Sequence, residues 1–196
     1  MMNKLIYTLV LGLLIISCKS NQSEHSGHEH REPEAATSAA EKSDNSKKSI
    51  PREAHGNVGD VHISMYYHSP AVRERVIWGG LVPFGEVWVT GAHSATNVEF
   101  SKAIKIAGTT IPKGKYAFFT IPGQDHWALI LNKNWEQHLT DDYDQKEDVI
   151  RIEVTPETEK PLTERLTYTI EDKRDGSGTI HMSWEKLSVS LPFQAD

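Results

Sequence analysis

Residues 115–131 read KYAFFTIPGQDHWALIL and predict a β-hairpin. Residues 115–121 and 126–131 are two runs rich in aromatic and aliphatic side chains, with the length and composition of strands. Between them stand residues 122–125 (PGQD), in which proline, glycine and aspartate are turn-forming types. The two runs are therefore expected to pair as adjacent antiparallel strands.

Similar segments recur on both sides of this hairpin. Apolar and polar residues alternate, as in half-buried strands, in residues 61–67, 97–100, 103–106, 149–154 and 166–170. Residues 86–89 form a short run of the same type, and residues 179–184 are expected to pair with residues 186–191. One stretch, residues 135–144, is assigned to a helix. Many short strands separated by turns predict an all-β fold: an antiparallel β-sandwich, jelly-roll-like, or an open barrel.

The N-terminus has the features of a bacterial lipoprotein signal peptide. Lys4 supplies a positive charge, and residues 5–16 form an apolar run that is shorter than the roughly 20 residues of a membrane span. Residues 15–18 (IISC) resemble a lipobox, after which such signals are cleaved before an acylated cysteine. Residues 1–17 are therefore predicted to be removed, and Cys18 to carry diacylglycerol and an amide-linked acyl chain such as palmitate.

Lipidation of Cys18 determines the expected location. Two or three acyl chains anchor a protein stably, so we expect a lipoprotein of the bacterial cell envelope that is attached to a membrane through Cys18. The chain contains one cysteine, which excludes an intrachain disulfide. Acylation also removes the thiol that cysteine-based catalysis requires.

Residues 18–57 are expected to be a disordered tether. They are rich in serine, glutamate, lysine and histidine, and Ile50 is their one large aliphatic residue. Such a segment cannot bury enough apolar surface to offset the entropy lost on ordering. A flexible chain of this length spans roughly 30–40 Å, enough to hold a domain clear of lipid headgroups.

Three histidines lie close together in this tether, in the sequence HSGHEH of residues 25–30. His25, His28 and His30 are candidate metal ligands, because imidazole suits copper and zinc. The alternative is that they are incidental residues of a polar linker. A site in a disordered segment must order itself on binding, so its affinity would be modest.

Residues 58–196 are expected to form one β-sandwich domain of ordinary size. The net charge of the chain is −6, and the excess of acidic residues falls in this domain. An acidic domain argues against a nucleic-acid partner and against flat adsorption on anionic lipid.

Four blocks of the domain have a distinctive order and spacing: SPAVRERVIWGGLVPFGEVWVTGAHSAT, IPKGKYAFFTIPG, WALILNKNWEQHLTDDYDQKEDVIRI and SWEKLSVSLPF. Together they resemble the bacterial domain-of-unknown-function family 2911 (DUF2911). The resemblance implies an envelope or secreted β-rich domain and no known reaction. Where the family pattern has an arginine after the second tryptophan and an Asn-Glu pair after Gly-Ala, this chain has Val89, His93 and Ser94. Any role of those three family residues therefore does not transfer.

The central blocks also contain the candidate ligand-binding residues of the domain. His68 ends a strand, and His93 follows a Gly-Ala turn, at positions where binding residues often lie. We predict a small-ligand pocket at one end of the sandwich, with apolar walls and few polar groups. Its predicted residues are His68, Arg73 or Arg75 as an anion contact, Trp78, Trp88 and His93. The alternative is that the histidines are loop residues and the tryptophans simple core.

An enzyme is the less favoured interpretation. No Gly-x-Ser-x-Gly elbow is present, and adjacency in sequence does not make His93 and Ser94 a base and nucleophile. The acidic residues 141–148 lack the spacing of an EF-hand and are expected to form a solvated loop. Three functions remain: binding of a small ligand or envelope partner, metal handling by the tether, and a hydrolase at the His68/His93 end.

Overall fold

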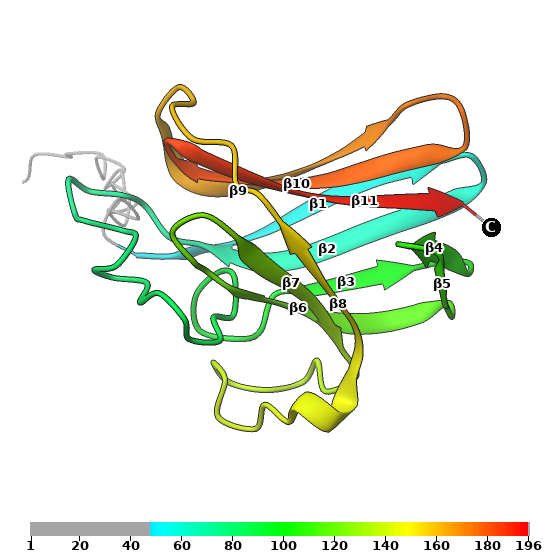
Figure 1. The fold of residues 1–196 in the computed structure, drawn as a ribbon, viewed down its shortest axis with the longest axis horizontal. Helices are drawn as coiled ribbons and strands as arrows, with labels where there is room; N and C mark the ends of the chain where they lie inside the picture. Colours follow the sequence, from blue (N-terminus) through cyan, green and yellow to red (C-terminus); the bar gives the residue numbers. More distant parts are fainter. Residues whose placement is uncertain (1–47, 196) are drawn as a thin grey trace, which may run out of the picture. The chain divides into compact units, whose positions relative to one another are not determined.

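The computed structural model describes residues 48–195, which form two antiparallel β-sheets (Figure 1). The six-stranded sheet contains, in spatial order, β1 (Ile50–Val58), β2 (Val61–Ser69), β3 (Asn97–Phe100), β6 (Gly114–Ile121), β7 (Trp127–Asn132) and β8 (Asp148–Val154). The five-stranded sheet contains β5 (Thr109–Ile111), β4 (Ile104–Ile106), β11 (Leu187–Ala195), β10 (Ser177–Glu185) and β9 (Thr163–Asp172). The predicted all-β sandwich is confirmed, and its two sheets do not close into a barrel.

The predicted hairpin of residues 115–131 forms as β6 and β7. The two strands pair from Ala117↔Asn132 to Ile121↔Ala128. Phe118 and Leu129 face the other sheet, and their neighbours Phe119 and Ile130 belong to a second apolar cluster. Both faces of these strands are therefore covered, which explains why the sequence shows a continuous apolar run here rather than alternation.

Strand β1 corrects the predicted boundary of the disordered segment. Disorder is predicted to residue 57, but β1 pairs with β2 along its whole length, from Ile50↔Ser69 to Val58↔Val61. A side chain at Gly56 would come within 2.7 Å of Ile170 in β9, so only a glycine allows this approach between the sheets. Apart from Ile50 and Val58, β1 consists of polar residues, proline, alanine and glycine, and that composition is also typical of a linker.

Three further local predictions differ from the structure. Residues 86–89 are a loop, and among the described residues their one β-bridge to the sheet is Trp88↔Thr120. The helix predicted at residues 135–144 is absent: this part of the described chain is turns, followed by the short 3-10 helix η2 (Gln145–Glu147). Strand β5, at Thr109–Ile111, lies where only turn residues were recognised.

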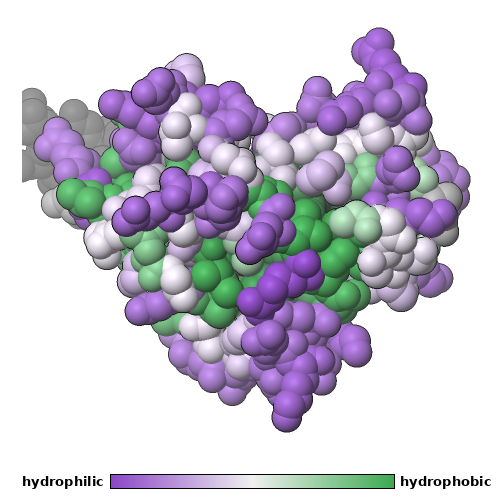
Figure 2. Space-filling view, viewed as in Figure 1, coloured by the Kyte–Doolittle hydropathy of each residue, from purple (hydrophilic) through white to green (hydrophobic). Residues whose placement is uncertain are grey.

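The main core fills the space between the sheets. Its largest fully buried side chains include Trp127, Trp184, Phe100 and Phe118. Strand β8 is at the edge of the larger sheet, and its inward-facing apolar residues are only partly buried. Figure 2 shows apolar surface in the region that β8 occupies in Figure 1.

A second, smaller core lies on the outer face of the larger sheet. Ala117, Phe119 and Ile130 point away from the main core and are covered by Trp135 and Tyr143. The rings of Phe119 and Tyr143 meet edge to face at 5.3 Å. The loop of residues 133–147 is thus packed onto the sheet rather than extended into solvent.

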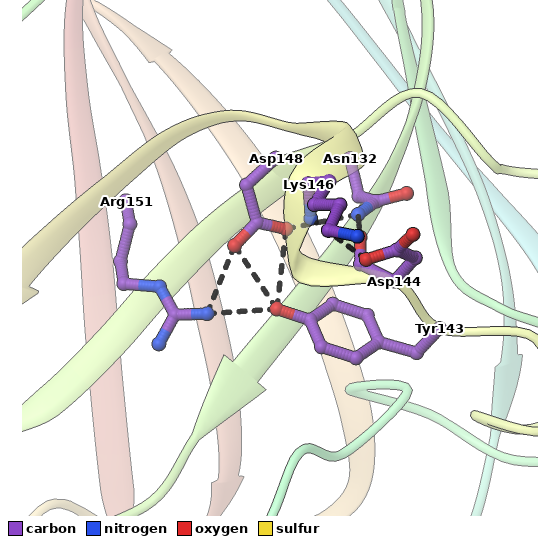
Figure 3. Close-up of polar contacts among 6 residues, drawn as sticks. All are labelled: Asn132, Tyr143, Asp144, Lys146, Asp148 and Arg151. Carbon is purple, nitrogen blue, oxygen red and sulfur yellow. Dashed lines mark hydrogen bonds and ion pairs between the residues drawn. The ribbon is translucent and has the colours of Figure 1, made fainter.

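A partly buried polar cluster fixes this loop (Figure 3). The Tyr143 hydroxyl donates to Asp148 Oδ2 at 3.0 Å, and Arg151 Nη2 donates to both the Tyr143 oxygen (2.7 Å) and Asp148 Oδ2 (2.9 Å). Asn132 Nδ2 donates to Asp148 Oδ1 at 2.9 Å. The Asp148 side chain is only 9 % exposed, so it is a structural anchor and not part of a solvated acidic run. Burial, and then the Asp148 hydrogen bond, raise the pKa of Tyr143 to about 12.

Several predictions concern residues outside the described range. The signal peptide, Cys18 and the tether histidines His25, His28 and His30 all precede residue 48. Within residues 48–195, no helix is long and apolar enough to cross a membrane.

Candidate functional site

Two long connections lie together at one end of the sandwich. Residues 70–96 join β2 to β3, and residues 133–147 join β7 to β8. They touch directly, because the Leu139 N–H donates to the His93 carbonyl at 2.6 Å and the Ala95 N–H donates to the Gln137 carbonyl at 3.0 Å. Connections of this length inside a compact domain commonly have a function.

The central motif, residues 90–95 (TGAHSA), is a loop that leaves the sheet and returns to it. Before the loop, Trp88 exchanges hydrogen bonds with Thr120 of β6. After it, the Phe118 N–H donates to the Thr96 carbonyl at 2.7 Å. The Thr96 N–H closes the loop by donating to the Val89 carbonyl at 3.2 Å.

Close packing holds this loop in place. A side chain at Gly91 would come within 2.7 Å of Thr96 Oγ1 and 3.2 Å of the His68 carbonyl oxygen, so the position requires glycine. From the other sheet, the Tyr168 hydroxyl donates to the Thr90 carbonyl at 2.7 Å. The loop is therefore fixed by both layers of the sandwich.

Within the connection of residues 70–96, four residues other than glycine have left-handed backbone conformations. Their φ angles are +50° at Arg73, +56° at Glu74, +52° at Thr90 and +65° at His93. Such conformations cost on the order of 1–3 kcal/mol each and tend to cluster at binding sites and ligand clamps. The strain occurs in the segments that carry the predicted site residues.

These segments surround a cavity of about 290 Å³, which we call the end cavity. Its cationic side chains are Arg73 and Arg75, and His93 adds an imidazole. Its apolar lining includes Leu81, Val82, Trp88, Leu139 and Trp184. The volume and the mixture of apolar walls with a few polar groups suit a small organic molecule.

The structure brings most of the predicted residues together. Arg73, Trp88 and His93 line the end cavity, as does Arg75. The two others lie just behind its wall. His68 contacts the His93 ring edge to face at 5.2 Å, and Trp78 contacts Trp88 at 5.8 Å.

Four tryptophans pack together behind and beside the end cavity. Trp78 lies at the centre, 4.8 Å from Trp127, 5.7 Å from Trp184 and 5.8 Å from Trp88, while Trp88 and Trp184 stack. Among the described residues, the indole N–H groups of Trp78, Trp127 and Trp184 are buried without a hydrogen-bond acceptor. An unused donor on Trp184 is notable because this residue lines the cavity.

The charge of the end cavity is positive. None of the described residues that line it is acidic. Arg75 is oriented by its own backbone, because Nε donates to the Val72 carbonyl (3.1 Å) and Nη2 to the Ala71 carbonyl (2.5 Å). Burial, and then the charge of Arg73, lower the pKa of Arg75, with Glu164 acting in the opposite direction. A bound anion would relieve the repulsion between the two arginines.

His68 is a neutral element of the wall. Burial, and then the charge of His93, lower the pKa of His68. Its Nδ1 atom is buried and has no hydrogen-bond partner among the described residues. Protonation of both rings would place two charges side by side, so the packed arrangement favours neutral His68.

His93 and Ser94 face different cavities. His93 lines the end cavity, whereas Ser94 lines a separate hollow of about 500 Å³ on the outer face of the larger sheet. The hydrolase interpretation needs a histidine and a serine that act on one substrate. The structure does not bring these two together.

Sequence reasoning did not identify Leu139 and Trp184 as site residues. Each is distant in sequence from residues 70–96, and both line the end cavity. Trp184 continues the core-facing set of β10, with Ile180 and Met182, and was therefore assigned only to the core. Its sole distinguishing signal is its position at the end of the strand, beside the loops.

The described residues contain no group of three or more histidine, cysteine, aspartate or glutamate side chains that could hold a metal ion. The domain itself therefore offers no evident metal centre within residues 48–195.

Comparison with known proteins gives one family match. The model of a family described as "Protein of unknown function (DUF2911)" matches residues 49–193. The match begins beside the first residue of β1, in agreement with the corrected domain boundary. No curated protein and no solved structure matches the chain.

Proposed function

Since the chain belongs to the DUF2911 family, for which no function is known, we propose a function from the site itself: the domain binds a small organic anion in the end cavity. The observation that carries the proposal is the convergence of Arg73, Arg75 and His93 on one cavity that also has tryptophan walls. Arginine pairs well with carboxylate and phosphate groups, because its planar guanidinium donates two parallel hydrogen bonds.

The cavity also indicates the rest of the ligand. Trp88 and Trp184 stack with an interplanar angle of 19° and offer a flat apolar wall. Leu81 and Leu139 are 47 % and 41 % exposed, so apolar surface continues to the rim. A carboxylate or phosphate attached to a compact aromatic or aliphatic body matches this distribution of charge and apolar surface.

A thermal-shift screen of small aromatic and aliphatic carboxylates and phosphates, followed by calorimetry, tests this proposal. A ligand should raise the melting temperature, and Arg73→Gln should weaken its binding roughly tenfold or more. Arg52→Gln, at an exposed position on β1, is the matched control. His93→Ala should weaken the same ligand without unfolding the domain. Equal affinities for the Arg73 and Arg52 variants would place the ligand elsewhere.

We also propose that the protein acts at the bacterial cell envelope, anchored by acylated Cys18. The apolar run at residues 5–16 and the IISC sequence support this proposal. Mass spectrometry of the protein from a bacterial host should find an acylated N-terminal Cys18, and Cys18→Ser should move the protein from the membrane to the soluble fraction. Membrane association that persists in the Cys18→Ser variant would contradict a lipid anchor at this residue.

Metal capture by the tether is a second candidate function. It rests on the three histidines within residues 25–30, whose imidazoles are ligands for copper and zinc. Deletion of residues 24–31 should abolish copper or zinc binding measured by calorimetry. Binding that survives the deletion would reject this role for the tether.

A further inference from the structure

The hollow that Ser94 lines is part of a longer groove on the outer face of the larger sheet. It shares Tyr66, Asn97 and Lys115 with a second hollow of about 220 Å³, which continues toward Glu53 and His55 on β1. We call the two together the outer groove. It crosses β6, β3, β2 and β1, whose outward-facing residues form its floor.

One wall of the outer groove is a fixed structure. Residues 135–138 form it, within the loop that the Tyr143–Asp148–Arg151 cluster pins to the sheet (Figure 3). The Ala95 N–H also binds the Gln137 carbonyl at 3.0 Å. The groove therefore exists before any ligand binds, which reduces the entropy that binding would cost.

Gln137 presents an unused hydrogen-bond acceptor in this wall. The residue is only 7 % exposed and lines the groove. Its Nε2 atom donates to the Asn134 carbonyl at 2.6 Å, which fixes the orientation of the amide. Oε1 is buried and has no partner among the described residues. Buried polar atoms are nearly always paired in native proteins, so this oxygen marks a position in the wall where a water or a ligand hydroxyl is the natural donor.

Aromatic and amide side chains also line the outer groove. Tyr66 is 38 % exposed on the floor. Trp135 is held in the wall by Lys115, whose Nζ lies 4.0 Å from the centre of the ring. Asn97, which is 7 % exposed, adds an amide to the floor.

The outer groove contains more carboxylates than cationic groups. Glu53, Glu99 and Glu136 line it together with Lys115, and the imidazoles of His55 and His138 add further polar groups. Its shape and chemistry thus differ from those of the end cavity: it is long, open and polar, with aromatic side chains and with carboxylates that can accept hydrogen bonds from hydroxyl groups. A neutral, elongated ligand with many hydroxyl groups matches these properties.

From this geometry we propose that the outer groove binds a saccharide chain. Hydroxyl groups supply the donor that Gln137 Oε1 lacks, and they also accept from the amide and ammonium groups of the floor. An extended peptide fits less well, because peptides are usually bound by pairing with a strand edge. The strands under this groove are already paired on both sides except β1.

Calorimetry with the full chain tests this inference, using hexasaccharides of β-1,4-linked glucose, β-1,4-linked N-acetylglucosamine, β-1,4-linked mannose and α-1,4-linked glucose. At least one should bind with a dissociation constant on the order of 1 mM or below. Tyr66→Ala and Gln137→Met should each weaken it roughly tenfold. Gln194→Met, at an exposed position on the other sheet, is the matched control and should leave the affinity unchanged.

Two variants separate this inference from the proposed anion site. Arg73→Gln should retain saccharide binding, and Tyr66→Ala should retain anion binding, because the two residues line different cavities. The saccharide assignment is overturned if none of the four hexasaccharides binds, or if neither Tyr66→Ala nor Gln137→Met changes the affinity. A groove that binds an unstructured peptide in place of these saccharides would overturn it as well. Because Tyr66 is exposed, its alanine variant keeps the test valid even if Gln137→Met is unstable.

Discussion

The end cavity and the outer groove lie on opposite sides of a wall that includes the neighbours His93 and Ser94, and they are built differently. The end cavity is lined by Trp184, a residue of the main core between the sheets. The outer groove is bounded by Trp135, which packs on the small second core. Substitutions in a site made from the main core should lower the stability of the whole domain. A site on the sheet surface depends instead on the position of a single pinned loop.

The largest expected effect follows from this difference in support. Trp184→Ala should lower the free energy of unfolding by about 3–5 kcal/mol, because it empties a fully buried position. Trp135→Ala should cost clearly less, because Trp135 is only half-buried. Urea denaturation followed by circular dichroism measures both. Equal losses would show that the two walls are supported equally.

Gly91→Ala should have the next largest effect, about 1–3 kcal/mol. The new methyl group would clash with Thr96 Oγ1, which donates to the Thr90 carbonyl at 3.0 Å across the loop. Thr96→Ala removes Oγ1, so Gly91→Ala and Thr96→Ala together should cost less stability than the sum of the two single variants. If the two losses simply add, the clash at Gly91 is not significant.

Tyr143→Phe should affect the outer groove more than the end cavity. It removes a hydroxyl that donates to Asp148 and accepts from Arg151, at a cost of about 1–2 kcal/mol. Hydrogen exchange of residues 133–147 should accelerate, while exchange in β10 stays slow. Faster exchange in β10 as well would mean that the loop and the main core unfold together.

The smallest effect concerns pH and the end cavity. The pKa of His68 is lowered below its ordinary value of 6.5, so the unfolded chain binds a proton more readily than the folded protein does. Stability is therefore complete above about pH 6.5 and falls as the pH decreases through this value. His68→Gln should flatten this dependence in melting temperatures measured between pH 5 and 8. An unchanged pH profile would show that His68 titrates normally.

Local sequence patterns predicted the strands well where one face or both faces of a strand are apolar. The hairpin of β6 and β7 is an example, because side-chain period and turn residues both occur within a short stretch. β1 was missed because its contact with β9 is made by Gly56. This residue lets the two strands approach because it has no side chain, and a glycine gives no apolar signal in the sequence. Residues 133–147 were misjudged because Tyr143 is held by Asp148 and Arg151, two residues of strand β8, which follows the loop.

The two candidate sites also differ in how far the sequence alone revealed them. Arg73, Trp88 and His93 stand in one connection, and their chemistry was recognisable in sequence. The outer groove joins Tyr66, Lys115 and Gln137 from three distant segments, and no short pattern relates them. Only the pairing of β2, β3 and β6 and the position of the pinned loop bring them together.

The first described residues of the chain give the end cavity one more property. Ser49 lines this cavity, and Arg165 Nη1 donates to the Lys48 carbonyl at 3.2 Å. The backbone just before β1 is therefore part of the rim of the end cavity and is held there by a side chain of β9, in the opposite sheet. A substitution of Arg165 should consequently change the shape of the rim although Arg165 is not among the residues that line the cavity.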